Sequence, residues 1–463
     1  MLVDFDNTYL DLPDRFYERT DPAGFDDPTM IRANGDLARR LGIDPDWLAS
    51  PEGAEFAVGN RLPDGAEPVA LAYAGHQFGS FVPQLGDGRA LLLGDVVDGE
   101  GERFDIQLKG SGRTPFSRRG DGRAPLGPVL REYLVSEAMH ALGIPTTRAL
   151  AAATTGEQVR RDGLEPGAVL VRVARSHIRV GTFQYVSARE DVEALRELTT
   201  YALDRHYPEL DPESPVALFD AVADRQAELV AQWQLAGFVH GVMNTDNMLV
   251  SGETIDYGPC AFMNAHDPAT VFSSIDDRGR YAYQNQPGIA RWNLERFAGA
   301  LAKLGDDTSG LRDELQSIVD DFPDRFEEAY AERMARKLGL GEFRHDDWTL
   351  SNDLLERMHR REVDFTLAFR RLAELADPDP YVDGPRIGDI FELPAAFDDW
   401  LDRWRNRLTE RDAPTAEIAD SMRAANPAVV PRNYRVNAAI DDAVEEGDFG
   451  AFHTLLSVLA DPY

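Results

Sequence analysis

The stretch HGVMNTDNMLVSGETIDYG (240–258) is the most informative part of the sequence for the fold. In it, amide and acidic side chains flank a short apolar run. The apolar residues 248–250 and the β-prone residues 254–255 flank Ser251-Gly252, a two-residue turn signal. Two-residue loops of this kind join antiparallel strands. The sequence therefore predicts a β-hairpin that turns at Ser251-Gly252.

Asn247 and Asp256 would face each other across this hairpin. Facing residues have Cβ atoms about 4.5–5.5 Å apart. An amide oxygen and a carboxylate at that separation could share Mg²⁺ or Mn²⁺, because both ions favour oxygen ligands. Asp246 would lie beside them, free to act as a base. The alternative interpretation is an Asx-rich turn around an ordinary hairpin.

The composition limits the class of protein. A chain of 463 residues, 43% of them hydrophobic, can form one large domain or two to three smaller ones. No window of about 18 uninterrupted apolar residues occurs, so we expect no membrane partner. The start, MLVDFDNTYLDLPDRF, lacks a basic segment followed by an apolar one, so we expect no signal peptide. Cys260 is the single cysteine, which excludes an intramolecular disulfide and suggests the cytoplasm.

The formal net charge is −33, and acidic residues are spread along the whole chain. Such a surface disfavours nucleic-acid binding, which needs a basic footprint. It suits high salt, where self-repulsion is screened, and we therefore expect a halophilic source. Arginine supplies 45 of the 48 basic residues, because lysine occurs only at 109, 303 and 337.

The pattern of elements changes along the chain. Helical patterns dominate from about residue 190, whereas the earlier part predicts one helix at 127–143 and strands at 90–97, 103–110, 146–156 and 167–174. We therefore expect an α+β fold of two lobes. Residues 1–187 would form a β-rich N-lobe with one key helix, and residues 188–463 a mostly helical C-lobe that carries the hairpin. Clefts between such lobes are where ligands bind.

Lys109 ends the predicted strand 103–110 in a chain that is poor in lysine. A lysine is a compact charge that suits phosphate. Glu132 on the following helix could hold it as an ion pair, and Glu137 is the rival partner. The two acids point about 140° apart on a helix, so only one should face the strand. The alternative is a surface lysine.

Two segments rich in glycine and arginine flank this strand, QLGDGR (84–89) and GSGRTPFSRRGDGRAP (110–125). Glycines let backbone N–H groups approach an anion, and arginines bind phosphate with two hydrogen bonds. Gly-Asp-Gly is also an ordinary turn, so each segment alone is a weak signal.

Arg172 and Arg179 lie seven residues apart, and an unbroken strand would point them to opposite faces. If both serve one ligand, the chain must bend near Ser176-His177; otherwise they are surface arginines. His240 precedes Asn247 by seven residues, and we interpret it as a structural histidine because no second histidine lies nearby to complete a metal site.

Together these residues have the parts of a kinase-like nucleotide site. Kinases carry a loop His-x-Asp-x-x-x-x-Asn, and His240 and Asn247 keep its spacing. Val242 stands at the position of the kinase base, and valine cannot accept a proton. The sequence looks like a kinase scaffold that has lost the kinase base.

The sequence closely resembles the selenoprotein O family of protein adenylyltransferases (YdiU-like or UPF0061 proteins, SelO-like pseudokinases). The matching stretches are YAGHQFGSFVPQLGDGRALLLG (73–94), QLKGSGRTPFSRRGDGRA (107–124), LREYLVSEAMHALGIPTTRAL (130–150), RVARSHIRVGTFQ (172–184), HGVMNTDNM (240–248), IDYGP (255–259) and NPAVVPRNYRVNAAI (426–440). The resemblance implies a protein-kinase-like pseudokinase fold that binds ATP in a flipped orientation. It implies transfer of AMP to Ser, Thr or Tyr hydroxyls of proteins, the chain itself among the candidates.

The resemblance also implies roles for individual residues. Asp246 would be the proton acceptor, and Asn247 and Asp256 would bind Mg²⁺. Glu132 would pair with Lys109. The residues expected to contact ATP are Gly86, Gly88, Arg89, Lys109, Asp121, Gly122, Arg172, Arg179 and Asp256.

The sequence departs from this family where it stops at LADPY, because many members carry a C-terminal cysteine or selenocysteine implicated in redox control. We therefore expect no such control here. Two other functions stay open. A small-molecule or protein kinase would use the same loop, but Val242 argues against a kinase because valine cannot act as the base. A catalytically dead pseudokinase could bind nucleotide with Lys109, Asn247 and Asp256 alone.

Overall fold

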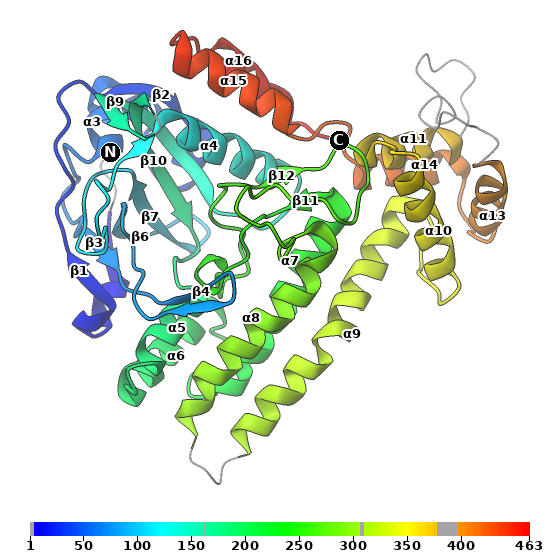
Figure 1. Cartoon of the computed structure of the whole chain (residues 1–463), viewed down its shortest axis with the longest axis horizontal. Helices are drawn as coiled ribbons and strands as arrows, with labels where there is room; N and C mark the ends of the chain where they lie inside the picture. Colours follow the sequence, from blue (N-terminus) through cyan, green and yellow to red (C-terminus); the bar gives the residue numbers. More distant parts are fainter. Residues whose placement is uncertain (1–3, 162, 306–309, 377–396) are drawn as a thin grey trace.

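The computed structural model describes residues 4–161, 163–305, 310–376 and 397–463, which form a mixed α/β protein (Figure 1). Eight strands form one antiparallel sheet in the order β1-β3-β6-β7-β10-β9-β2, and β8 pairs with β10. The strands are β1 (Tyr17–Arg19), β2 (Thr29–Ala33), β3 (Val69–Leu71), β6 (Ala90–Val97), β7 (Arg103–Lys109), β8 (Ala124–Pro125), β9 (Arg148–Arg160) and β10 (Leu164–Ala174). The four predicted strands are thus confirmed as β6, β7, β9 and β10.

The two faces of the sheet follow the two-residue period of its strands. Along β10, Val169, Val171 and Val173 pack with helices on one face, whereas Leu170 and Arg172 face α4 on the other. The helices are α1 (Gly35–Arg40), α2 (Pro45–Leu48) and α3 (Pro51–Val58) on the first face and α4 (Leu126–Ala141) on the second. The predicted helix 127–143 is therefore confirmed, and polar side chains of the sheet point toward it.

The chain is mostly helical after β10. The helices are α5 (Val180–Ser187), α6 (Val192–His206), α7 (Pro215–Ala236), α8 (Gln286–Leu301), α9 (Leu311–Leu338), α10 (Asp347–Arg360), α11 (Phe365–Ala376), α13 (Asp398–Leu408) and α14 (Thr415–Ala425). Two last helices, α15 (Asn433–Glu445) and α16 (Gly450–Leu459), return to pack on α4 (Figure 1). Of the helices in the described ranges, none has the length and hydropathy needed to cross a bilayer.

Helix α7 ends shortly before the stretch 240–258, and local sequence signals fix both of its ends. The side chain of Ser214 accepts a hydrogen bond from Ala217 N, and Pro215 starts the helix. Gly237 ends it with φ 71°, a left-handed conformation that suits glycine. The chain then enters β11 (Phe238–Val239) and the stretch itself.

The hairpin predicted within 240–258 is not formed, which corrects that part of the prediction. β11 pairs instead with β12 (Ala261–Phe262), so the two strands enclose the stretch from outside. Inside it, residues 245–247 form a short 3₁₀ helix, η3 (Thr245–Asn247).

Segments distant in sequence take the place of the missing hairpin partner. Val180 N donates to Met248 O at 2.9 Å, and Thr254 pairs with Thr146 beside the end of α4. The buried backbone groups of 248–255 are thus satisfied by tertiary contacts, which leave no need for pairing within the stretch.

Candidate active site

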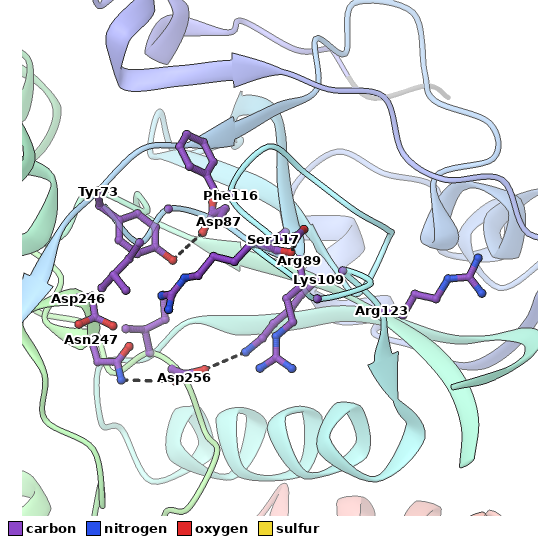
Figure 2. Close-up of a pocket in the computed structure, with 18 of the residues that line it drawn as sticks. Tyr73, Asp87, Arg89, Lys109, Phe116, Ser117, Arg123, Asp246, Asn247 and Asp256 are labelled. Atoms are coloured by element: carbon purple, nitrogen blue, oxygen red, sulfur yellow. Dashed lines mark hydrogen bonds and ion pairs between the residues drawn. The ribbon is translucent and has the colours of Figure 1, made fainter. Parts of the chain in front are cut away.

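A cavity of about 470 Å³ lies where loops of the sheet meet residues 246–256 (Figure 2). This volume is in the range of small-molecule sites. Its lining includes Gly86, Gly88, Arg89, Lys109, Asp121, Gly122, Arg172, Arg179, Asp246, Asn247 and Asp256. Glu132 lies behind the lining, bonded to Lys109. The fold therefore brings the predicted catalytic, metal-binding and ATP-contacting residues, together with Glu132, to one place.

Lys109 is the centre of a buried ion-pair network. Its Nζ lies 2.5 Å from Glu132 Oε2 and 3.0 Å from Asp256 Oδ1. Glu132 Oε1 also accepts a bond from Arg172 Nη1 at 3.1 Å. Burial by itself raises the pKa of Glu132, but the charges of Lys109 and Arg172 outweigh it and leave the pKa lowered. Because Lys109 is only 8% exposed, it is not a surface lysine.

Glu137, the rival partner, points away from this network. It accepts two bonds from the Arg148 guanidinium, both at 2.8 Å, and one from Ala149 N at 2.9 Å. The prediction that only one of the two acids would face Lys109 is therefore confirmed, with Glu132 as that acid.

Asp256 and Asn247 are neighbours even without a hairpin. Asn247 Nδ2 lies 3.4 Å from Asp256 Oδ2. Asp256 has φ 69°, which is uncommon outside glycine and marks a position held by its surroundings. The charge of Lys109 holds the pKa of Asp256 well below its usual range. Asp256 is thus an ionised, fixed carboxylate.

Asp246 on η3 has a different environment, although it is close to the same cavity. It is 8% exposed, and its Oδ1 has no hydrogen-bond partner among the described residues. Burial raises the pKa of Asp246 to about 6. A Cβ on Gly75 would lie 2.3 Å from Oδ1, so the glycine leaves room for the carboxylate. A carboxylate with a free oxygen and a pKa near neutrality is suited to accept a proton.

Arg172 and Arg179 reach the same cavity because the chain bends between them, as the odd spacing predicted. β10 ends at Ala174, and Arg179 directly precedes α5. His177 N donates to Asp105 Oδ2 at 2.8 Å, which fixes the bend.

Neighbouring residues hold the guanidinium of Arg179 in place without using all of its hydrogen-bond donors. Its guanidinium lies 4.3 Å from the ring centroid of Tyr73, and Nη1 donates to Asp246 O at 3.0 Å. Nη2 is buried and has no hydrogen-bond partner within the described ranges. An anionic oxygen in the cavity would complete its hydrogen bonding.

His240 is structural, as predicted. It is 1% exposed, its Nε2 lies 2.9 Å from Ile255 O, and Val242 N lies 3.3 Å from its Nδ1. The ring therefore links the start of the stretch 240–258 to the segment that carries Asp256.

The two glycine-rich segments pack against each other at the mouth of the cavity. Thr114 Oγ1 donates to Asp87 O at 2.6 Å. A Cβ on Gly86 would lie 2.3 Å from the Phe116 ring, and one on Gly122 only 1.9 Å from Gly112 O. These glycines therefore allow the two loops to pack in direct contact.

Gly122→Ala is expected to weaken ATP binding by about tenfold or more, because a displaced loop misplaces its arginines. The added Cβ would meet Gly112 O, and the φ of +70° at Gly122 is unfavourable for alanine. Isothermal titration calorimetry with ATP measures the effect. Gly99→Ala is the matched control, because a Cβ there meets nothing within 4 Å. A folded Gly122→Ala protein with unchanged ATP affinity would show that this loop does not shape the site.

Asp121 faces the outer part of the cavity and binds Arg161 with two hydrogen bonds, at 2.9 and 3.0 Å. The bond from Arg161 lowers the pKa of Asp121. Arg161 was not predicted from the sequence, because it belongs to no motif and follows a long strand. Other lining residues that were not predicted are Tyr73, Gln77, Asp87, Phe116, Arg118 and Arg123. Most of these lie in the quoted glycine-rich stretches, where proximity to the predicted residues was the available signal.

The cavity is basic in a strongly acidic protein. Seven basic and four acidic side chains line it, whereas the whole chain has a net charge of −33. Arg89 forms no ion pair with any described residue. Such a lining favours a polyanion such as a nucleoside triphosphate.

Asn247 and Asp256 can supply oxygen ligands to a divalent cation. No group of three or more His, Cys, Asp or Glu side chains in a metal-binding arrangement occurs in the described ranges. Mg²⁺ commonly binds one or two carboxylates and completes its shell with waters and substrate phosphates. The pair therefore fits an ion that arrives with a nucleotide, provided that the Asn247 amide turns its oxygen toward Asp256.

Comparisons with known proteins identify the family of this chain. The family described as "Protein adenylyltransferase SelO" matches residues 1–460. The chain is 57% identical over 466 residues to "Protein nucleotidyltransferase YdiU" of Rhodopseudomonas palustris (strain BisB5), covering 99% of this chain and 94% of that protein. It is 58% identical over 470 residues to the protein of that name from Methylorubrum extorquens (strain PA1), covering 100% and 94%. The chain therefore belongs to the protein adenylyltransferase SelO family, a family of nucleotidyltransferase enzymes.

Proposed function

We propose that this protein transfers AMP from ATP to Ser, Thr or Tyr hydroxyls of proteins and releases pyrophosphate. The observation that carries the proposal is Asp246, a buried carboxylate whose Oδ1 has no hydrogen-bond partner among the described residues. Beside it lies Arg179, whose buried Nη2 also has no hydrogen-bond partner there. The family description and the names of the relatives support a nucleotidyl group as the group transferred. The chain's own hydroxyls are among the candidate acceptors.

The proposed fold is that of a kinase-like pseudokinase with two lobes. The sheet and α4 support an N-lobe over 1–187, and the helices from α6 onward support a C-lobe over 188–463. The cavity would lie between the lobes, with Lys109 from one and Asp256 from the other.

ATP is proposed to bind in a flipped orientation, with its α-phosphate nearest to Asp246. Gly86, Gly88, Arg89, Asp121 and Gly122 would contact the nucleotide from the two glycine-rich loops. Lys109, Arg172 and Arg179 would face the phosphates, because they combine positive charge with burial. A divalent ion held by Asn247 and Asp256 would neutralise charge on the phosphate oxygens.

In the proposed step, the acceptor hydroxyl oxygen forms a bond to the α-phosphorus. The bond from that phosphorus to the oxygen bridging to the β-phosphate breaks, and its electron pair leaves with pyrophosphate. The hydroxyl proton passes to Asp246, whose pKa of about 6 leaves it ionised at neutral pH. Lys109 and the arginines stabilise the charge that builds on pyrophosphate.

Val242 distinguishes this proposal from a kinase. Its backbone oxygen accepts a bond from Asn247 Nδ2 at 3.0 Å, and its side chain offers no base. A kinase would have to abstract the hydroxyl proton from that position. Asp246 lies four residues further on, which supports transfer at a different phosphorus.

The test is intact-mass spectrometry after incubation with ATP, Mg²⁺ and a generic acceptor protein in KCl, which suits a protein that we propose to be halophilic and cytoplasmic. An added AMP on acceptor or enzyme is the expected result. An added phosphate would instead establish a kinase. Nucleotide binding without any adduct would establish a pseudokinase scaffold.

A further inference from the structure

A second cavity, of about 540 Å³, adjoins the loop that carries Asp246. Phe78 lines it, and the preceding residue, Gln77, lines the first cavity together with Asp246. Asn244 joins the two, because its Oδ1 accepts bonds from Phe78 N at 3.1 Å and from the Tyr281 hydroxyl at 2.7 Å. A molecule in the second cavity would therefore lie close to the proposed base.

Two arginines without carboxylate partners line this second cavity. Neither Arg278 nor Arg280 forms an ion pair with any described residue, although the chain has 81 acidic residues for 48 basic ones. No acidic side chain is part of the lining. Asp276 is nearby in sequence, but its carboxylate accepts bonds from the backbone N–H groups of Arg280 and Tyr281, at 2.9 and 2.8 Å. The buried Nε of Arg280 has no hydrogen-bond partner in the part of the chain that the structure describes.

The start of α8 adds to the positive potential of this cavity. Gly288 and Ile289 in its first turn belong to the lining. The first turn contains no acidic residue, and no side chain caps it. Helix N-termini carry a partial positive charge, which here acts together with Arg278 and Arg280.

Aromatic side chains lie next to Arg280, outside the lining of the cavity. The Arg280 guanidinium lies 4.7 Å from a ring centroid of Trp292, which His76 also contacts. Phe81 of the small β4–β5 hairpin (Gly75–Gln77 and Ser80–Val82) is 41% exposed, and its ring contacts that of His76 at a tilt of 44°. Exposed aromatic residues with arginine are typical of the anchors of protein interfaces.

We propose that this second cavity docks the acceptor protein through an acidic residue close to the hydroxyl that receives AMP. This inference rests on the proposed function, because it assigns the acceptor of that same reaction. If the first cavity holds ATP, as the proposed function requires, the adjoining surface offers the acceptor a way to Asp246. Neither Arg278 nor Arg280 pairs with a carboxylate of the described residues, so both can complement a carboxylate of the acceptor and oppose a basic segment.

The test compares two synthetic peptides that share one serine, flanked by glutamates in one and by lysines in the other. AMP transfer is followed by mass spectrometry at the lowest KCl concentration that keeps the enzyme folded, because salt screens the effect. We expect the glutamate peptide to react about tenfold faster or more. Equal rates would overturn the docking inference and leave adenylyl transfer intact. No transfer to either peptide or to any protein would overturn the proposed function itself.

Charge-reversal variants of the two arginines provide a second test of the docking inference. Arg278→Glu and Arg280→Glu should each lose the preference for the glutamate peptide, while ATP affinity stays unchanged. Arg278 is exposed, so its replacement is not expected to disturb folding. Arg312→Glu on α9 is the control for an equal change in net charge at an exposed arginine. A preference that survives in Arg278→Glu and Arg280→Glu contradicts the inference.

Discussion

Replacing Asp246 with asparagine should slow AMP transfer by about 10²- to 10⁴-fold, the usual contribution of a general base. Asparagine keeps the size of the side chain and the neighbouring hydrogen bonds of η3, but it cannot accept the hydroxyl proton. ATP should still bind, because the buried cations Lys109, Arg172 and Arg179 are untouched. Single-turnover rates and ATP affinities, measured on the same preparation, separate the two effects. A rate within tenfold of the wild type would show that Asp246 is not the base.

The stability of the same variant provides an internal control. Burial raises the pKa of Asp246 to about 6, so the ionised carboxylate destabilises the folded state as pH rises above its unfolded pKa. Removing the charge should raise the free energy of unfolding by about 3 kcal/mol at pH 8 and by about half of that at pH 5. Urea unfolding in metal-free buffer measures this free energy of unfolding at each pH. Loss of activity together with higher stability cannot be attributed to misfolding.

Asp256→Asn should have the opposite effect on stability. The pKa of Asp256 is lowered by Lys109, so its ionised form stabilises the folded state above the unfolded pKa. That stabilisation is lost as the pH falls toward the lowered pKa. The variant should therefore be less stable than the wild type at pH 8, with a smaller difference in acid.

Lys109→Met is expected to have the second largest effect, on both stability and ATP binding. Removing one member of a buried ion pair typically costs about 3–5 kcal/mol. Glu132 would retain Arg172, but Asp256 would lose its counter-charge. We expect the lower end of that range, because the Asp256 side chain is 35% exposed and water can replace part of the interaction. Loss of a buried charge from the proposed phosphate site should also abolish measurable transfer.

Lys303→Met is the matched control for this change, because it removes another of the three lysines. Lys303 lies outside the cavity lining and donates a bond to Ser187 O at 2.8 Å. Urea unfolding and calorimetry with ATP should show a small change there. If Lys109→Met behaved like Lys303→Met, the buried network would not support the site.

Features of the site that depend on local geometry could be predicted from the sequence. The helical period indicated that only one of Glu132 and Glu137 could face Lys109. The odd spacing of Arg172 and Arg179 required a bend, and the bend is present. These conclusions needed only the geometry of one element at a time.

The hairpin prediction was wrong for a physical reason. Asn247 and Asp256 do lie side by side, but residues 178–180 and 145–147 hold the stretch between them. Two apolar runs around a Ser-Gly turn can pair with each other or with other segments, and local sequence does not distinguish these outcomes. Arg161 and the second cavity were missed for the same reason, because both depend on contacts between distant segments.

The sequence by itself determined four of the eight strands of the sheet, the key helix, the family and seven of the eleven charged residues that line the cavity. Tertiary structure alone decided their chemical states. Asp246 and Asp256 are the same residue type, yet burial raises the pKa of one and Lys109 lowers that of the other. The physical reason is that pKa depends on desolvation and on the nearest charges. Those are set by residues up to 147 positions apart in the chain.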